Sequence, residues 1–135
     1  TLAASALAGG LAQSGAHRDQ HHFKPRAHYA DLLAAVNDCL VKGQQCIAHC
    51  LVVFQEGDTS LAECAAKVHE MQAICEAFSY LLASNSTYVK DYAGICVAAC
   101  EDCEKVCREH EEHFECRDCA DACQALVKAI KKSIT

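Results

Sequence analysis

Cysteine is the residue type that offers this sequence most of its chemistry, because 12 of the 135 residues are cysteines. Several of them are spaced so that two thiols lie one helical turn apart on the same side of a helix. A thiolate is a nucleophile, a redox group and a soft metal ligand. The pairs with CxxxC spacing are Cys46/Cys50, Cys96/Cys100, Cys103/Cys107 and Cys119/Cys123, and those with CxxC spacing are Cys100/Cys103 and Cys116/Cys119.

Helices are the elements that must position these thiols. A single proline and six glycines argue against a loop-rich fold held together by disulfides. Apolar residues recur with the helical period over roughly residues 26–55, over 58–83, from the turn at 84–87 to about 108, and over 114–133. Short connections make successive helices antiparallel, so the sequence predicts an all-α, up-down-up-down four-helix bundle.

Two helix ends carry local signals. Gly57 is expected to end the first helix in a left-handed conformation. Ser60 and Glu63 have the spacing of a capping box at the start of the second helix.

The cysteines fall on the inward stripe of every predicted helix when residues are placed about 100° apart around the helix axis. Lys, Glu and Asp lie mainly on the other faces, as in any soluble bundle. The sequence therefore predicts a core lined with thiols. Its members are Cys39, Cys46, Cys50, Cys64, Cys75, Cys96, Cys100, Cys103, Cys107, Cys116, Cys119 and Cys123.

Three interpretations of this lining compete. Buried cysteines can act as small hydrophobic residues, but twelve of them exceed what packing requires. Disulfides within one helix are disfavoured, because Cβ atoms at i and i+4 lie about 5–6 Å apart and a disulfide needs about 3.5–4.5 Å; bridges between helices stay open. Metal binding is the favoured interpretation, and soft thiolates with two or three sulfur ligands per ion indicate Cu(I).

At this point the sequence resembles a known family. The motif Cys46-Ile-Ala-His49-Cys50, the seam from Cys96 to Cys107 and the run through Cys116, Cys119 and Cys123 are similar to the bacterial copper storage proteins, over roughly residues 27–135. The resemblance implies a non-catalytic bundle that holds many Cu(I) ions and takes them up through one end. It also implies a homotetramer that exchanges copper with a chaperone or a copper-dependent enzyme.

Histidines gather where such a bundle would take up metal. His49 near the end of the first helix, and His110 and His113 between the third and fourth, are expected at one end of the bundle. Imidazole binds copper and is largely unprotonated near neutral pH. Met71, the single methionine, is included in this uptake set as a weak thioether ligand, with core packing as the alternative. His69 is expected on the surface.

The net charge excludes some partners. Twelve basic against eighteen acidic residues give a charge of −6, which disfavours nucleic acid and anionic membranes as ligands. No motif for nucleotide binding or hydrolysis is present, so catalysis is not expected. A thiol redox protein and a protein that sequesters zinc or cadmium remain the alternative functions.

The chain divides into three parts. Residues 1–16 are uncharged, rich in Ala, Gly and Leu, and end in small residues, which resembles the remnant of a signal peptide. Residues 17–25 are a His-containing linker, and residues 26–135 are the metal-binding bundle. Export, for example to the periplasm, follows from this interpretation, and a cytoplasmic location is the alternative. No stretch is long and apolar enough to span a bilayer.

Overall fold

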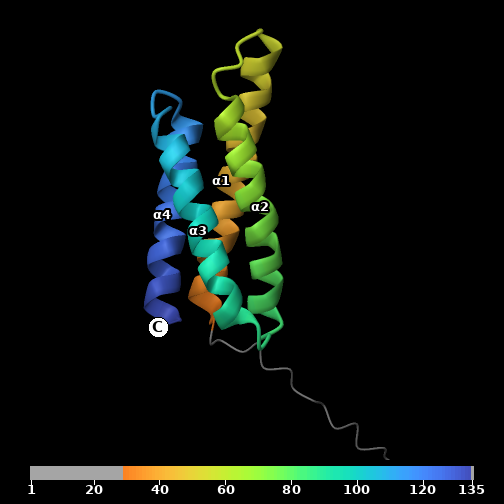
Figure 1. Cartoon of the computed structure of the whole chain (residues 1–135), viewed down its shortest axis with the longest axis vertical. Coiled ribbons are helices and arrows are strands. Elements are labelled where there is room, and N and C mark those ends of the chain that lie inside the picture. Colours follow the sequence, from red (N-terminus) through yellow and green to blue (C-terminus); the bar gives the residue numbers. More distant parts are fainter. Residues whose placement is uncertain (1–28, 135) are drawn as a thin grey trace, which may run out of the picture.

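Four helices make up the computed structural model, which describes residues 29–134 (Figure 1). They are α1 (Ala30–Gln55), α2 (Ala62–Ala83), α3 (Val89–Arg108) and α4 (Phe114–Ser133). No strand occurs in this part of the chain. The predicted signal-peptide remnant, residues 1–16, and the predicted linker, residues 17–25, lie outside the described residues.

The helices form the predicted antiparallel bundle. Helix α1 packs against α2 and α4, and α3 packs against the same two helices. The connections 56–61 and 109–113 therefore lie at one end of the bundle, and the connection 84–88 lies at the other (Figure 1). This arrangement confirms the fold class expected from short connections between amphipathic helices.

The connection between α1 and α2 confirms one expected signal and corrects the other. Gly57 has φ of +82°, and its N–H donates to the Phe54 carbonyl at 3.0 Å, as expected for a glycine at a helix end. The capping box is wrong, because Leu61 occupies the cap position and no side chain caps the helix. The Ser60 N–H donates instead to Asp58 Oδ1 at 2.8 Å, so the turn is satisfied before the helix begins.

The buried core changes its chemistry along the bundle. Toward the end that carries the 84–88 connection it is hydrocarbon, and the rings of Phe78 and Tyr92 stack with centroids 6.1 Å apart. Toward the other end cysteines replace these side chains. Burial of hydrocarbon contributes about 1.5–3 kcal/mol per side chain, so this part can hold the helices together without metal. Its main residues are Leu32, Val36, Phe78, Leu82, Val89, Leu126 and Ile130.

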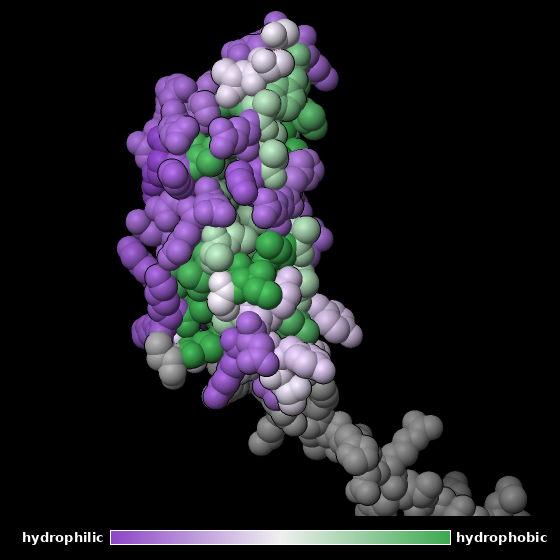
Figure 2. Space-filling view, viewed as in Figure 1, coloured by the Kyte–Doolittle hydropathy of each residue, from purple (hydrophilic) through white to green (hydrophobic). Residues whose placement is uncertain are grey.

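The surface is mixed in character. Figure 2 shows hydrophilic residues along the α4 side and a hydrophobic area on the lower half of the face that carries α2 and α3. Ile95 of α3 contributes to exposed apolar surface, with 52% of its area accessible. Among the described residues, none of the helices combines the length and apolar character needed to cross a membrane.

Candidate metal centre

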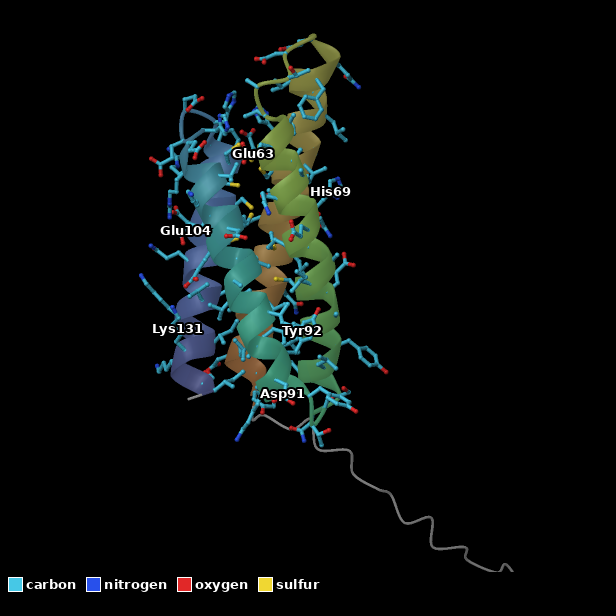
Figure 3. The ribbon with its side chains drawn as sticks, viewed as in Figure 1. Glu63, His69, Asp91, Tyr92, Glu104 and Lys131 are labelled. Atoms are coloured by element: carbon cyan, nitrogen blue, oxygen red, sulfur yellow. The ribbon has the colours of Figure 1, made fainter. Side chains whose placement is uncertain are left out.

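All twelve cysteine side chains lie inside the bundle, and each is 0% exposed. The prediction that every helix directs its cysteines inward is confirmed. Figure 3 shows the sulfur atoms in the space between the helices. The inward stripe of each helix arises because positions three and four residues apart share a face, and the hydrocarbon part of the core fixes which face is buried.

Toward the end that carries the 56–61 and 109–113 connections, one thiol from each helix meets the others. The Sγ atom of Cys64 lies 3.4 Å from that of Cys107, 3.8 Å from that of Cys116 and 3.8 Å from that of Cys46. Cys46 and Cys116 are also 3.8 Å apart. Because these residues come from α1, α2, α3 and α4, this cluster exists only in the assembled bundle.

The remaining thiols form further groups that share members. The Sγ atom of Cys75 lies 3.6 Å from that of Cys96 and 3.8 Å from that of Cys100, and Cys39 lies 3.7 Å from Cys123. Cys100 and Cys123 each belong to two groups, so neighbouring groups are connected. Groups whose three sulfurs all lie within 4.8 Å of one another include Cys39/Cys100/Cys123, Cys46/Cys64/Cys107, Cys75/Cys96/Cys100 and Cys103/Cys119/Cys123.

These groups draw their thiols from more than one helix, whereas a CxxxC pair lies on a single helix. A CxxxC pair offers two thiols on one face of a single helix, and Cys103 and Cys107 do lie 3.9 Å apart on α3. Every three-thiol group among the described residues, however, joins two or three helices. Cys50 belongs to none of these groups. In two of these groups, Cys75/Cys96/Cys100 and Cys103/Cys119/Cys123, one helix supplies two thiols and a neighbouring helix supplies the third. In the other two groups each thiol comes from a different helix.

Hydrogen bonds among the thiols shift their pKa values in different directions. Hydrogen bonds from Cys107 and Cys116 lower the pKa of Cys64, and a hydrogen bond from Cys123 lowers that of Cys100. The donors show the opposite effect: the bond to Cys100 raises the pKa of Cys123.

Other thiols of the core follow the same pattern. A hydrogen bond from Cys103 lowers the pKa of Cys119. Burial raises the pKa of Cys50 to about 11. The thiols that accept hydrogen bonds from their neighbours are therefore the ones that ionise first.

The core provides no positive side chain to balance such thiolates. Gln72 is the only polar or charged residue, apart from the thiols, that is buried among the described residues, and it is uncharged. An unpaired charge in a dry core is strongly unfavourable. A bound cation would supply the missing charge and the missing ligand contacts together. The donor set therefore fits soft monovalent or divalent metal ions.

Two of the predicted histidines meet at the end of α1. His49 Nε2 and His113 Nδ1 lie 2.8 Å apart, and both side chains are partly exposed, at 23% and 28%. His110 is also partly exposed, and its carbonyl accepts a hydrogen bond from the His113 N–H at 3.0 Å. The residues reach one place because the 109–113 connection turns beside the C-terminal half of α1.

Carboxylates that are not among the expected site residues accompany these histidines. Glu115 Oε1 lies 3.5 Å from His49 Nδ1, and Glu112 Oε1 lies 3.7 Å from His113 Nε2. Both carboxylates belong to the acidic stretch around His113 in the sequence. The signal that would have identified them is their spacing of one and two residues from His113.

Met71 is buried in the core, whereas His69 lies on the surface. Met71 is fully buried, and its Sδ atom lies 3.6 Å from Cys39 Sγ. Met71 therefore lies among the core thiols and not with the partly exposed histidines. His69 is exposed on α2 and points away from the bundle, as expected for a surface residue (Figure 3).

Comparison with known proteins identifies a family and a solved structure that are similar to this chain. The family model described as copper storage protein matches residues 25–135 of the chain. Among solved structures, the Cu(I)-bound copper storage protein BsCsp3 superposes with a TM-score of 0.70, at 22% sequence identity, over 80% of this chain and 99% of that chain. At this identity the superposition shows a shared fold. No curated protein matches the sequence.

Proposed function

Since the chain belongs to the copper storage protein family, whose model spans the whole described bundle, we propose that it stores several Cu(I) ions on the thiols of its core. All twelve cysteines act as ligands in this proposal. The BsCsp3 structure, which has the same fold, is described as Cu(I)-bound and supports the same assignment.

The observation that carries the proposal is the set of three-thiol groups, three of which are connected by shared cysteines. Each group offers three sulfurs within 4.8 Å of one another, all of them buried. Cu(I) is satisfied by two or three soft ligands, and thiolates are the ligands that select it. Because Cys100 and Cys123 are each shared between two groups, neighbouring ions can be bridged by one thiolate. Such an arrangement stores many ions in a small volume.

The alternative of a thiol redox enzyme fits the structure less well. Reactive cysteines are partly exposed and lie in electropositive surroundings. All twelve thiols here are 0% exposed, and the described core contains no cationic side chain near them. We therefore propose a binding protein without catalytic activity.

Zinc is the alternative cargo that one observation favours. Tetrahedral zinc with Zn–S distances of about 2.3 Å places its sulfurs about 3.8 Å apart. Cys46, Cys64 and Cys116 have that mutual spacing, 3.8 Å for each pair. The family favours copper, and a direct competition between the two metals distinguishes them.

The test is a titration of the reduced protein with Cu(I) under anaerobic conditions, in competition with a chromogenic Cu(I) chelator. We expect retention of several ions per chain, approaching the number of cysteines, before the chelator is coloured, with helicity unchanged. Added zinc should not displace them. Retention of at most one Cu(I), or displacement of copper by equimolar zinc, would contradict the proposal.

We propose that metal is taken up at the histidine cluster, which consists of His49, His110 and His113. Support comes from their partial exposure and from the 2.8 Å contact between His49 and His113. Cys50 follows His49 on α1 and is buried, so the partly exposed imidazole borders the thiol-lined core.

The location and assembly of the protein are proposals of the same kind. We propose export, because of the composition of residues 1–16, and a homotetramer that exchanges copper with a chaperone or a copper-dependent enzyme. The exposed apolar residues Leu51, Val52 and Phe114, at 55%, 53% and 59%, support a subunit contact. Fractionation of the producing cells and light scattering of the purified chain test these two points; cytoplasmic protein and a monomer would contradict them.

A further inference from the structure

The sulfur lining of α1 and α2 is interrupted in the middle of the bundle. Between Cys39 and Cys46 the buried position of α1 is Gly43, and between Cys64 and Cys75 the buried apolar residues of α2 are Val68 and Met71. Met71 therefore supplies the only sulfur on α2 over a stretch of about 16 Å, at 1.5 Å per residue.

Met71 borders a group of thiols. Its side chain is fully buried, and Sδ lies 3.6 Å from the Sγ atom of Cys39. Cys39 in turn lies 3.7 Å from Cys123, and these two form a three-thiol group with Cys100. The thioether is thus in contact with a group that already fits a Cu(I) ion.

Because Gly43 has no side chain, it leaves the space that the Met71 side chain occupies. A Cβ atom at position 43 would lie 3.1 Å from Met71 Cε and 3.0 Å from Gln72 Nε2. Gln72 is held there, because its Nε2 donates to the Leu40 carbonyl at 3.3 Å. The methionine therefore occupies a defined space at a close approach of α1 and α2, and its sulfur is directed to Cys39.

We propose that Met71 is a Cu(I) ligand of the core, which completes a mixed thiolate and thioether site with Cys39. This inference rests on the proposed function. When the ion binds, Cys39 loses its thiol proton to solvent and forms a Cu–S bond, while a sulfur lone pair of Met71 forms a dative bond and no bond of Met71 breaks. A thioether is soft and neutral, so it adds a ligand without adding negative charge to the core.

The site has a consequence for movement of metal along α2. Met71 lies seven residues from Cys64 and four from Cys75 in the sequence. It divides the gap between these thiols into steps of about 10 Å and 6 Å along the helix. An ion at Met71 thus connects the thiols near the histidine cluster with the deeper group around Cys75.

Selenomethionine tests the proposal directly, because the chain contains one methionine. Protein carrying selenomethionine at position 71, with any initiator methionine removed, is measured by selenium X-ray absorption with and without Cu(I). We expect a copper neighbour of selenium in the loaded protein only. If the loaded protein retains copper and selenium has no copper neighbour, the inference fails and the proposed function stands. If the protein retains no copper, the proposed function itself fails.

A variant gives a second measurement. Met71→Leu keeps the volume of the side chain and removes the sulfur, so the apo protein should remain folded by circular dichroism. The chelator should then withdraw the most weakly held Cu(I) at a several-fold lower concentration than in the parent protein. Val68→Ala alters the same stripe of α2 without removing sulfur and is the control. Equal retention by Met71→Leu and the parent protein would overturn the inference.

Discussion

The Sγ atoms of Cys64 and Cys107 lie 3.4 Å apart, although the residues are 43 positions apart in the sequence and belong to α2 and α3. Cys64 also contacts Cys46 of α1 and Cys116 of α4. A single thiol therefore joins all four helices. Metal bound at this point links the helices to one another, and its removal leaves apolar packing and weak hydrogen bonds between thiols to hold them at that level.

Replacing Cys64 by alanine should lower the number of retained Cu(I) ions by more than replacing Cys50 does. Cys64 takes part in a three-thiol group and contacts three helices, whereas Cys50 belongs to no such group among the described residues. Chelator competition on both variants measures the loss, with His69→Ala as a surface control. Equal losses for the two cysteine variants would show that the cross-helix groups do not define the sites.

The reduced, metal-free protein should lose stability as the pH rises above 9. Burial raises the pKa of Cys50 from 9.0 to about 11, so the folded chain keeps this proton where the unfolded chain has lost it. The unfolded state then binds fewer protons, and the free energy of unfolding falls with pH through this range. Thiols with lowered pKa, such as Cys64, are ionised in both states once the pH is well above 9.0, so they do not oppose the fall toward pH 11.

Thermal unfolding at several pH values under reducing conditions measures this effect. The Cu(I)-loaded protein is the matched control, because its thiols have already released their protons to bind metal. Its midpoint should change much less over the same range. An apo midpoint that is constant or rises between pH 9 and pH 11 would contradict the burial argument.

Two glycines should respond in opposite ways to substitution by alanine. Gly43→Ala places a methyl group 3.0 Å from Gln72 Nε2 and 3.1 Å from Met71 Cε, so overpacking should lower the free energy of unfolding by about 1–3 kcal/mol. Gly94 is helical and exposed, with open space around its added Cβ, so Gly94→Ala should raise it by about 0.5–1 kcal/mol. Denaturant unfolding of the apo proteins checks both values, and a neutral Gly43→Ala would refute the close approach.

Removing His49 should slow the uptake of Cu(I) without changing how much is finally held. The imidazole pair of His49 and His113 is partly exposed, and the core thiols do not depend on it. Stopped-flow transfer from a coloured Cu(I) complex should become several-fold slower in His49→Ala and in His113→Ala, and remain unchanged in His69→Ala. A lower final capacity at an unchanged rate would assign the histidines to storage instead of uptake.

The features that the sequence predicted well are those that depend on the helical period. Cys96, Cys100, Cys103 and Cys107 were expected on one face of a helix, and all four are buried. The range 114–133 was expected for the last helix, and α4 covers Phe114–Ser133. Both predictions depend on the helical period and on the polarity of neighbouring residues, which are properties of a short segment. The capping box at Ser60 failed for a local reason, since Asp58 and a tight turn take its place.

The sequence by itself determined that this protein has four amphipathic helices with thiols on their buried faces. It did not determine which thiols are in contact. The helical period gives the direction of a side chain around its own helix, but not its position along the bundle axis relative to the residues of another helix. The contacts of Cys64 with Cys107, of His49 with His113 and of Met71 with Cys39 join different elements. Their register follows from the connections and from the packing of the hydrocarbon core, and these exist only in the folded chain.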